Sequence, residues 1–123
     1  MTPEEVVRAE LAAWDRLDVD GIMSFFAPDA VWDNVPIGPA TGRDEIRQAV
    51  DAYVGRMTSA DLEIVNVAVA GNVVLIERVD HFLFDGQKID ARVMGAFEIT
   101  GDMISAWRDY FDTGHGDGPV KDS

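Results

Sequence analysis

The sequence contains no cysteine among its 123 residues. A chain without cysteine forms no disulfide, offers no thiolate nucleophile and supplies no sulfur ligand to a metal. No apolar run approaches the roughly 18 residues that cross a bilayer, and the segment Met1–Glu5 lacks the basic start and apolar stretch of a signal peptide. We therefore expect a cytoplasmic protein with no membrane partner.

Basic residues are scarce, with 10 Lys and Arg against 23 Asp and Glu and a formal net charge of −13. Such a charge repels the phosphates of nucleic acids, so a nucleic-acid partner is not expected. A neutral organic ligand suits this surface better, and most of the surface carboxylates serve only solubility. His81 and His115 have no partner at metal-ligand spacing, so no metal site is expected.

The first part of the chain predicts three helices. Thr2 is a candidate N-cap, and Pro3 and Glu5 complete a capping box before an apolar stripe at helical spacing. Further on, the pattern predicts a short helix, a strand, a loop and a third helix, around residues 22–26, 30–35, 36–42 and 44–57.

From residue 61 onward the pattern changes to that of strands. Four strands are expected, over residues 62–70, 73–84, 89–100 and 103–111. Tight turns at Gly71-Asn72, Asp85-Gly86 and Gly101-Asp102 join them as hairpins. Helices followed by an antiparallel meander predict one α+β domain over residues 1–112, with helices packed on one face of a curved sheet. Residues 113–123 are expected to form a loose tail.

Charged residues interrupt the apolar faces of two predicted strands. Alternate residues of a strand share a face, which places Arg78 and Asp80 among large apolar side chains, and Asp109 between Trp107 and Phe111. Unpaired buried charges are costly, but one arginine can bridge two carboxylates. We therefore interpret Arg78, Asp80 and Asp109 as a buried triad on the concave side of the sheet. The alternative is a surface salt bridge on an edge strand, which the flanking aromatics disfavour.

Such a triad supports acid–base chemistry. Two carboxylates coupled through one arginine split their titrations, so that one can hold a proton as a general acid while the other stays ionised as a general base. Trp32 and Asn34 share one face of the strand over 30–35. The amide of Asn34 can both accept and donate, which suits holding a water molecule beside a base. The alternative is that Asn34 only ends a strand before Pro36.

The segments that carry these residues resemble the limonene-1,2-epoxide hydrolase family, within the larger group of NTF2-like and SnoaL-like cone folds. They are residues 39–44, 77–80, 93–98 and 106–112. The resemblance implies a cone-shaped, cystatin-like α+β fold on a mixed, mostly antiparallel sheet. It also implies hydrolysis of an epoxide to a diol in one step, with no covalent intermediate and no cofactor.

The resemblance assigns a role to each polar residue. Asp109 is the base that takes a proton from water, Asp80 is the acid that protonates the epoxide oxygen, and Arg78 holds both. Asn34 positions the water. Trp32 stands where the family usually has a Tyr whose hydroxyl also binds this water; an indole N–H can only donate.

An apolar pocket is expected beside the triad, for a lipophilic, terpenoid or cyclic epoxide. Its expected lining comes from helices and strands: Trp14, Tyr53, Met57, Phe82, Ala91 and Val93. The alternative for each of these residues is plain core packing.

Two other classes of function fit the same fold. One is an isomerase or cyclase of the ketosteroid-isomerase or SnoaL kind, which needs a lone base and an oxyanion donor rather than two carboxylates tied by an arginine. The other is a non-catalytic carrier of lipophilic ligands. The resemblance also implies a homodimer, formed through an outer sheet face that includes Leu75, Val79, Met94 and Tyr110.

Overall fold

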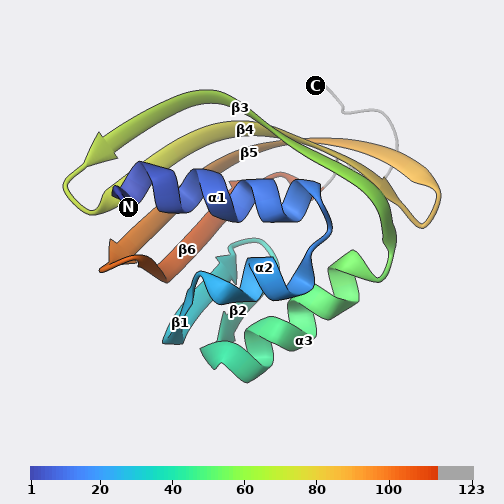
Figure 1. The fold of residues 1–123 in the computed structure, drawn as a ribbon. Helices are drawn as coiled ribbons and strands as arrows, with labels where there is room; N and C mark the ends of the chain where they lie inside the picture. The colour runs from blue at the N-terminus through green and yellow to red at the C-terminus, as the bar shows by residue number, and fades with distance from the viewer. Residues whose placement is uncertain (114–123) are drawn as a thin grey trace.

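Three helices lie against the concave side of one curved, six-stranded sheet in the computed structural model, which describes residues 1–113 (Figure 1). The helices are α1 (Pro3–Asp15), α2 (Val19–Ser24) and α3 (Gly42–Val54). The strands are β1 (Phe26–Asn34), β2 (Gly38–Thr41), β3 (Met57–Ala70), β4 (Val73–Phe84), β5 (Gln87–Thr100) and β6 (Met103–Phe111). The predicted α+β class, with helices packed on one face of a sheet, is confirmed.

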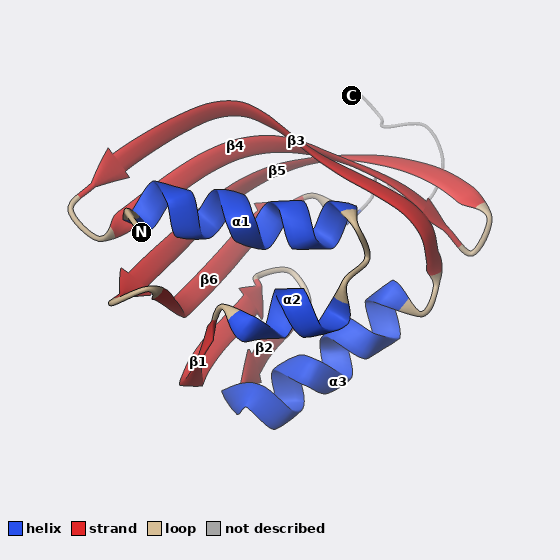
Figure 2. Cartoon of the chain, in the orientation of Figure 1, coloured by secondary structure: helices blue, strands red, loops and turns tan. Residues whose placement is uncertain are grey.

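The strand order is β2-β1-β6-β5-β4-β3. Strands β3 to β6 form the predicted antiparallel meander, with turns at the three predicted dipeptides. β1 joins this meander in parallel beside β6 and pairs antiparallel with β2 on its other side (Figure 2). The sheet is therefore mixed and mostly antiparallel, as expected.

The helix α1 begins as its sequence predicts. The Thr2 side chain accepts from the Glu5 backbone N–H at 3.1 Å, and the Glu5 side chain accepts from the Thr2 backbone at 2.7 Å, which completes the capping box. At the other end, Asp15 accepts a hydrogen bond from the backbone N–H of Leu62 on the edge strand β3 at 2.8 Å. These contacts fix both the start of α1 and its position across the sheet.

The boundaries of several elements differ from the sequence prediction. The second helix ends at Ser24, because Phe26 already belongs to β1 and is paired with Ile104 of β6. Part of the predicted loop over 36–42 is the edge strand β2, in which Pro39 is opposite Asp33. A strand at the edge of a sheet has one side without a partner, so it tolerates a proline, which lacks an N–H. The prolines of this segment therefore do not exclude a strand, although they led to the prediction of a loop.

The third helix and the strand after it also differ in extent. α3 ends at Val54 rather than near Met57, which is the first residue of β3 and lies opposite Phe84. β5 likewise begins at Gln87, two residues before the predicted start. The predicted tail, apart from Thr113, and His115 lie outside the described residues.

Aromatic side chains form the centre of the core. Trp107 stacks on Phe97 at 4.6 Å between ring centroids, on Trp32 at 5.3 Å and on Phe26 at 6.1 Å. Trp14 of α1 meets Trp107 edge-on at 6.4 Å and lies 5.6 Å from Trp32. These contacts attach α1 and β1 to the middle of the sheet. Within residues 1–113, no helix has the length and apolar character needed to cross a membrane.

Candidate active site

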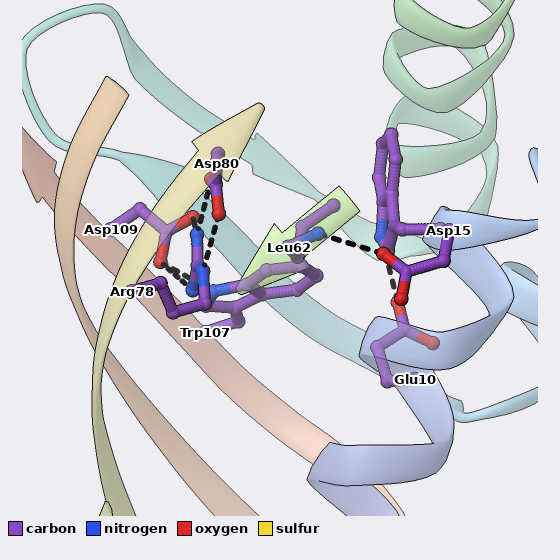
Figure 3. A network of polar contacts seen from close by, with 8 residues as sticks. Glu10, Asp15, Leu62, Arg78, Asp80, Trp107 and Asp109 are labelled. Atoms are coloured by element: carbon purple, nitrogen blue, oxygen red, sulfur yellow. Dashed lines mark hydrogen bonds and ion pairs between the residues drawn. The ribbon is translucent and has the colours of Figure 1, made fainter. Parts of the chain in front are cut away.

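Arg78 lies between two carboxylates on the concave side of the sheet (Figure 3). Its Nε and Nη2 donate to the two oxygens of Asp80, each at 2.9 Å. Its Nη1 and Nη2 donate to Oδ1 and Oδ2 of Asp109 at 3.1 and 2.9 Å. One guanidinium therefore makes two forked contacts, and its Nη2 is shared by both acids. The predicted cluster is brought together as expected.

Sheet register builds this cluster. Arg78 and Asp80 are two residues apart on β4, so their side chains share a face. On β5, Val93 is paired with Arg78 and Gly95 with Asp109 of β6, so the two charged strands flank β5 rather than touch each other. Arg78 must reach across β5 to Asp109, which a long side chain with a planar donor fork can do.

The cluster is nearly shielded from solvent. Arg78 is 1% exposed, and Asp80 and Asp109 are each 5% exposed. Burial by itself lowers the pKa of Arg78, but Asp109 and Asp80 outweigh burial and raise that pKa above its already high usual value. Arg78 is therefore a permanent cation, and the cluster carries a net charge of −1 when both acids are ionised.

Burial also raises the pKa of Asp80 above its usual value, although the hydrogen bonds and charge of Arg78 oppose this shift. The nearby charge of Asp109 raises the pKa of Asp80 further. The surroundings of Asp80 thus make it easier for this carboxyl to hold a proton.

Asp109 receives a third donor that Asp80 lacks. The indole Nε1 of Trp107, two residues earlier on β6, donates to Oδ1 of Asp109 at 2.7 Å. Three N–H groups therefore donate to Asp109, whereas two donate to Asp80. The two acids, although bound to one cation, lie in different surroundings.

Gly95 lies next to the cluster and leaves space for it because glycine has no side chain. A Cβ at this position would lie 2.8 Å from Nη1 of Arg78 and 2.8 Å from Oδ1 of Asp109. Both distances are too short for a carbon contact, so only glycine allows this approach over β5. A lone glycine inside a strand is the sequence signal for such a close passage, and sequence reasoning did not use it.

An apolar cavity of about 200 Å³ opens beside the cluster. All six residues expected to line it do so, namely Trp14, Tyr53, Met57, Phe82, Ala91 and Val93. Sequence reasoning missed the other apolar residues of its wall, which are Ile37, Leu62, Phe84, Ile89, Trp107 and Phe111. Phe84, Trp107 and Phe111 could have been found, since they lie on the same strand faces as the charged residues.

Trp32 and Asn34 also line the cavity. The parallel pairing of β1 with β6 puts Asn34 opposite Asp109 and Trp32 opposite Trp107. The indole nitrogen of Trp32 is buried and has no hydrogen-bond partner among residues 1–113. In this conformation Trp32 therefore supports the wall through its ring, and Asn34 is the polar side chain that β1 presents to the cavity.

His81 follows Asp80 on β4, so its side chain lies on the opposite face of the strand. Its Nδ1 contacts Asp90 at 2.6 Å and its Nε2 contacts Glu63 at 2.9 Å. These carboxylates raise the pKa of His81. In the part of the chain that the structure describes, no group of three His, Asp or Glu residues is placed to hold a metal ion.

Fold and site together define a class: a small α+β cone that holds two buried acids on one arginine at the wall of an apolar cavity. Residues 1–115 match the family model described as the limonene-1,2-epoxide hydrolase catalytic domain. The chain belongs to this family.

Relatives agree with this assignment. Epoxide hydrolase EphG of Mycobacterium tuberculosis is 29% identical over 106 residues, which are 86% of this chain and 70% of EphG. The structure of an epoxide hydrolase of M. tuberculosis, described as LEH-like, superposes with a TM-score of 0.81 and 28% identity, covering 90% of this chain and 83% of that one. An NTF2-like protein of Cytophaga hutchinsonii shares the fold, with a TM-score of 0.73, 13% identity and 91% of each chain covered. The predicted NTF2-like fold is confirmed.

The close passage at Gly95 leads to a first prediction. Gly95→Ala should lower the free energy of unfolding by roughly 2–4 kcal/mol, because the new methyl forces the buried ions apart. Urea denaturation measures this loss. Ala96→Gly is the matched control, since its side chain points to the other sheet face; an equal loss in both variants would contradict the steric explanation.

Proposed function

We propose that this protein is an epoxide hydrolase that adds water to a small lipophilic epoxide and releases a vicinal diol. The observation that carries the proposal is the shared Nη2 of Arg78, 2.9 Å from an oxygen of Asp80 and 2.9 Å from an oxygen of Asp109, at the wall of an apolar cavity. Membership of the limonene-1,2-epoxide hydrolase family supports the same chemistry.

In the proposed reaction Asp109 is the general base. It takes a proton from a water molecule that the side chain of Asn34 helps to hold, and the water oxygen forms a bond to one epoxide carbon. Three N–H groups donate to Asp109, so its oxygens already act as acceptors in the site, as a general base requires. Trp32 belongs to the same wall and, with its nitrogen buried, acts here through shape.

Asp80 is the general acid of the same step. As the carbon–oxygen bond of the ring breaks, Asp80 gives its proton to the departing oxygen, so that the alkoxide never has to exist free in an apolar cavity. The raised pKa of Asp80 favours the protonated form it starts from. Asp109 gains one proton while Asp80 loses one, and exchange with solvent resets the pair.

The cavity limits the size of the proposed substrate. A closed apolar cavity of about 150 Å³ holds a benzene molecule, and this cavity measures about 200 Å³. A compact epoxide carrying one ring therefore fits beside the cluster. Cyclohexene oxide and styrene oxide are suitable probes, and a terpenoid epoxide is the upper end of this class.

The main experiment measures diol formation from a panel of such epoxides. With enzyme in excess in ¹⁸O-labelled water, a single turnover should place the label in the diol, because the oxygen comes directly from water. Unlabelled diol from the first turnover would show an ester intermediate on the enzyme and overturn the direct mechanism. If no epoxide is opened, the isomerase and carrier alternatives replace this proposal.

Neutralising either acid tests the assignment of roles. Asp80→Asn and Asp109→Asn should each lower kcat/KM by about 10² to 10⁴, the usual contribution of an acid or a base. Both variants keep a hydrogen-bond acceptor for Arg78, and circular dichroism with thermal melting checks that they fold. Wild-type rates in either variant would exclude that residue from the reaction.

The pH profile supplies the readout that separates acid from base. Because the acid must be protonated, the wild-type rate should fall as pH rises past the raised pKa of Asp80. Lys88→Ala, a change at an exposed side chain that does not line the cavity, is the control and should leave the profile unchanged. A rate that stays constant far into the alkaline range would contradict the acid role.

We also propose that two copies of the chain associate through the outer sheet face. Leu75, Met94 and Tyr110 expose 37%, 42% and 48% of their surface there, and neighbouring exposed apolar residues of this kind commonly mark an interface. Sedimentation equilibrium should give twice the 13.5 kDa mass of the chain. Met94→Glu, which places a charge in this face, should lower the measured mass toward that of the monomer. A wild-type protein that sediments as a monomer would exclude this interface.

A further inference from the structure

Glu10 is a fully buried acid that the proposed reaction does not use. It lies in the middle of α1 and is 0% exposed. Its Oε2 accepts a hydrogen bond from Nε1 of Trp14, one turn later, at 3.3 Å, whereas its Oε1 has no hydrogen-bond partner among the described residues. No Lys or Arg in the described part of the chain forms a salt bridge with it within 4 Å.

Burying an acid at position 10 lowers the stability of the fold. Burial raises the pKa of Glu10 well above its usual value, and the hydrogen bond from Trp14 only opposes this shift. One polar atom of the side chain, Oε1, is unsatisfied in the core, where an apolar residue of similar size would pack without such a loss. Its presence needs an explanation other than stability.

Trp14 is the residue through which Glu10 can affect the site. Its side chain lines the cavity, whereas Glu10 does not. The ring meets Trp107 edge-on, at an interplanar angle of 83°, and Trp107 in turn donates to Asp109. Figure 3 shows Glu10 on one side of the view and the Arg78 cluster on the other, with Trp107 beside the cluster.

We propose that Glu10 is a positioning residue, which fixes the indole of Trp14 in the cavity wall and thereby helps to select which epoxides fit beside Arg78. The hydrogen bond favours this ring orientation, because turning the indole N–H away from Glu10 would break the bond and leave a buried polar group without this partner. The selection of epoxides rests on the proposed function; the link between Glu10 and Trp14 does not.

Two variants of Glu10 separate the hydrogen bond from the mere presence of a side chain. Glu10→Gln keeps an acceptor for Trp14, whereas Glu10→Leu fills the space without one. The chain has three tryptophans, so a ¹⁵N–¹H correlation spectrum gives three indole signals, and Trp14→Phe identifies the one from Trp14. Trp107, bonded to Asp109, and Trp32, with a buried and unpartnered nitrogen, serve as internal references.

The Trp14 indole proton should stay at its wild-type shift in Glu10→Gln. In Glu10→Leu it should move toward the position of an unbonded indole and exchange faster with solvent deuterium. An unchanged Trp14 signal in Glu10→Leu would overturn the proposal without any reference to catalysis.

The second readout is selectivity between styrene oxide and cyclohexene oxide. Glu10→Leu should change the ratio of their kcat/KM values about tenfold, mainly through KM, because a displaced ring alters the apolar fit. Glu10→Gln should keep the wild-type ratio. If wild type opens neither epoxide, the same ratio is taken from their dissociation constants, measured by tryptophan fluorescence.

A double-mutant comparison assigns the effect to the hydrogen bond. In a Trp14→Phe background there is no indole N–H, so Glu10→Gln and Glu10→Leu should give the same selectivity ratio. If Glu10→Leu still changes that ratio tenfold relative to Glu10→Gln, Glu10 acts by another route and the proposal is wrong.

Discussion

The shared guanidinium of Arg78 is the interaction on which the rest of the site depends. Three buried charges can exist in this core only because each is met by an opposite one at hydrogen-bond distance. Removing Arg78 would leave two carboxylates facing each other in apolar surroundings. The strands around Arg78 are arranged so that this one side chain can reach both acids. The proposed chemistry follows from the different surroundings of Asp80 and Asp109.

That difference arises from small features of the neighbouring residues. Trp107 adds a donor to Asp109 and none to Asp80, so two acids on one cation become unequal. Gly95 contributes by having no side chain, since a methyl group there would occupy the space between Arg78 and Asp109. The cavity wall is mostly apolar, and in such surroundings of low dielectric constant each hydrogen bond to an acid has a larger electrostatic effect than in water.

Much of this could be predicted from the sequence. Alternation along a strand is enough to place Arg78 and Asp80 on one face, and the same rule places Asp109 between aromatic side chains. The hairpin dipeptides fixed the limits of β4 and β6 closely. Local patterns of this kind report what a residue's own strand does, which is why the meander and the charged cluster were accessible.

What local patterns do not report is contact between distant segments. β1 was predicted too short because the pairing of Phe26 with Ile104 depends on a strand at the other end of the chain. Two local contacts were also missed. The bond from Trp107 to Asp109 depends on the orientation of an indole ring, which the spacing of the residues does not give. Glu10 lies within the apolar stripe of α1, three residues after Val7 and four before Trp14, so its burial could have been predicted. Nothing in the sequence indicated that the indole nitrogen of Trp32 would be buried without a hydrogen-bond partner among the described residues.

The parallel pairing of β1 with β6 has a consequence for how the protein folds. This contact joins an early segment of the chain to its last strand, and closing so long a loop is entropically demanding until the intervening meander has formed. Asn34 and Asp109 face each other only across that pairing. The polar corner of the cavity is therefore complete only once β6 has been synthesised and paired with β1, so the site needs every segment between these two strands.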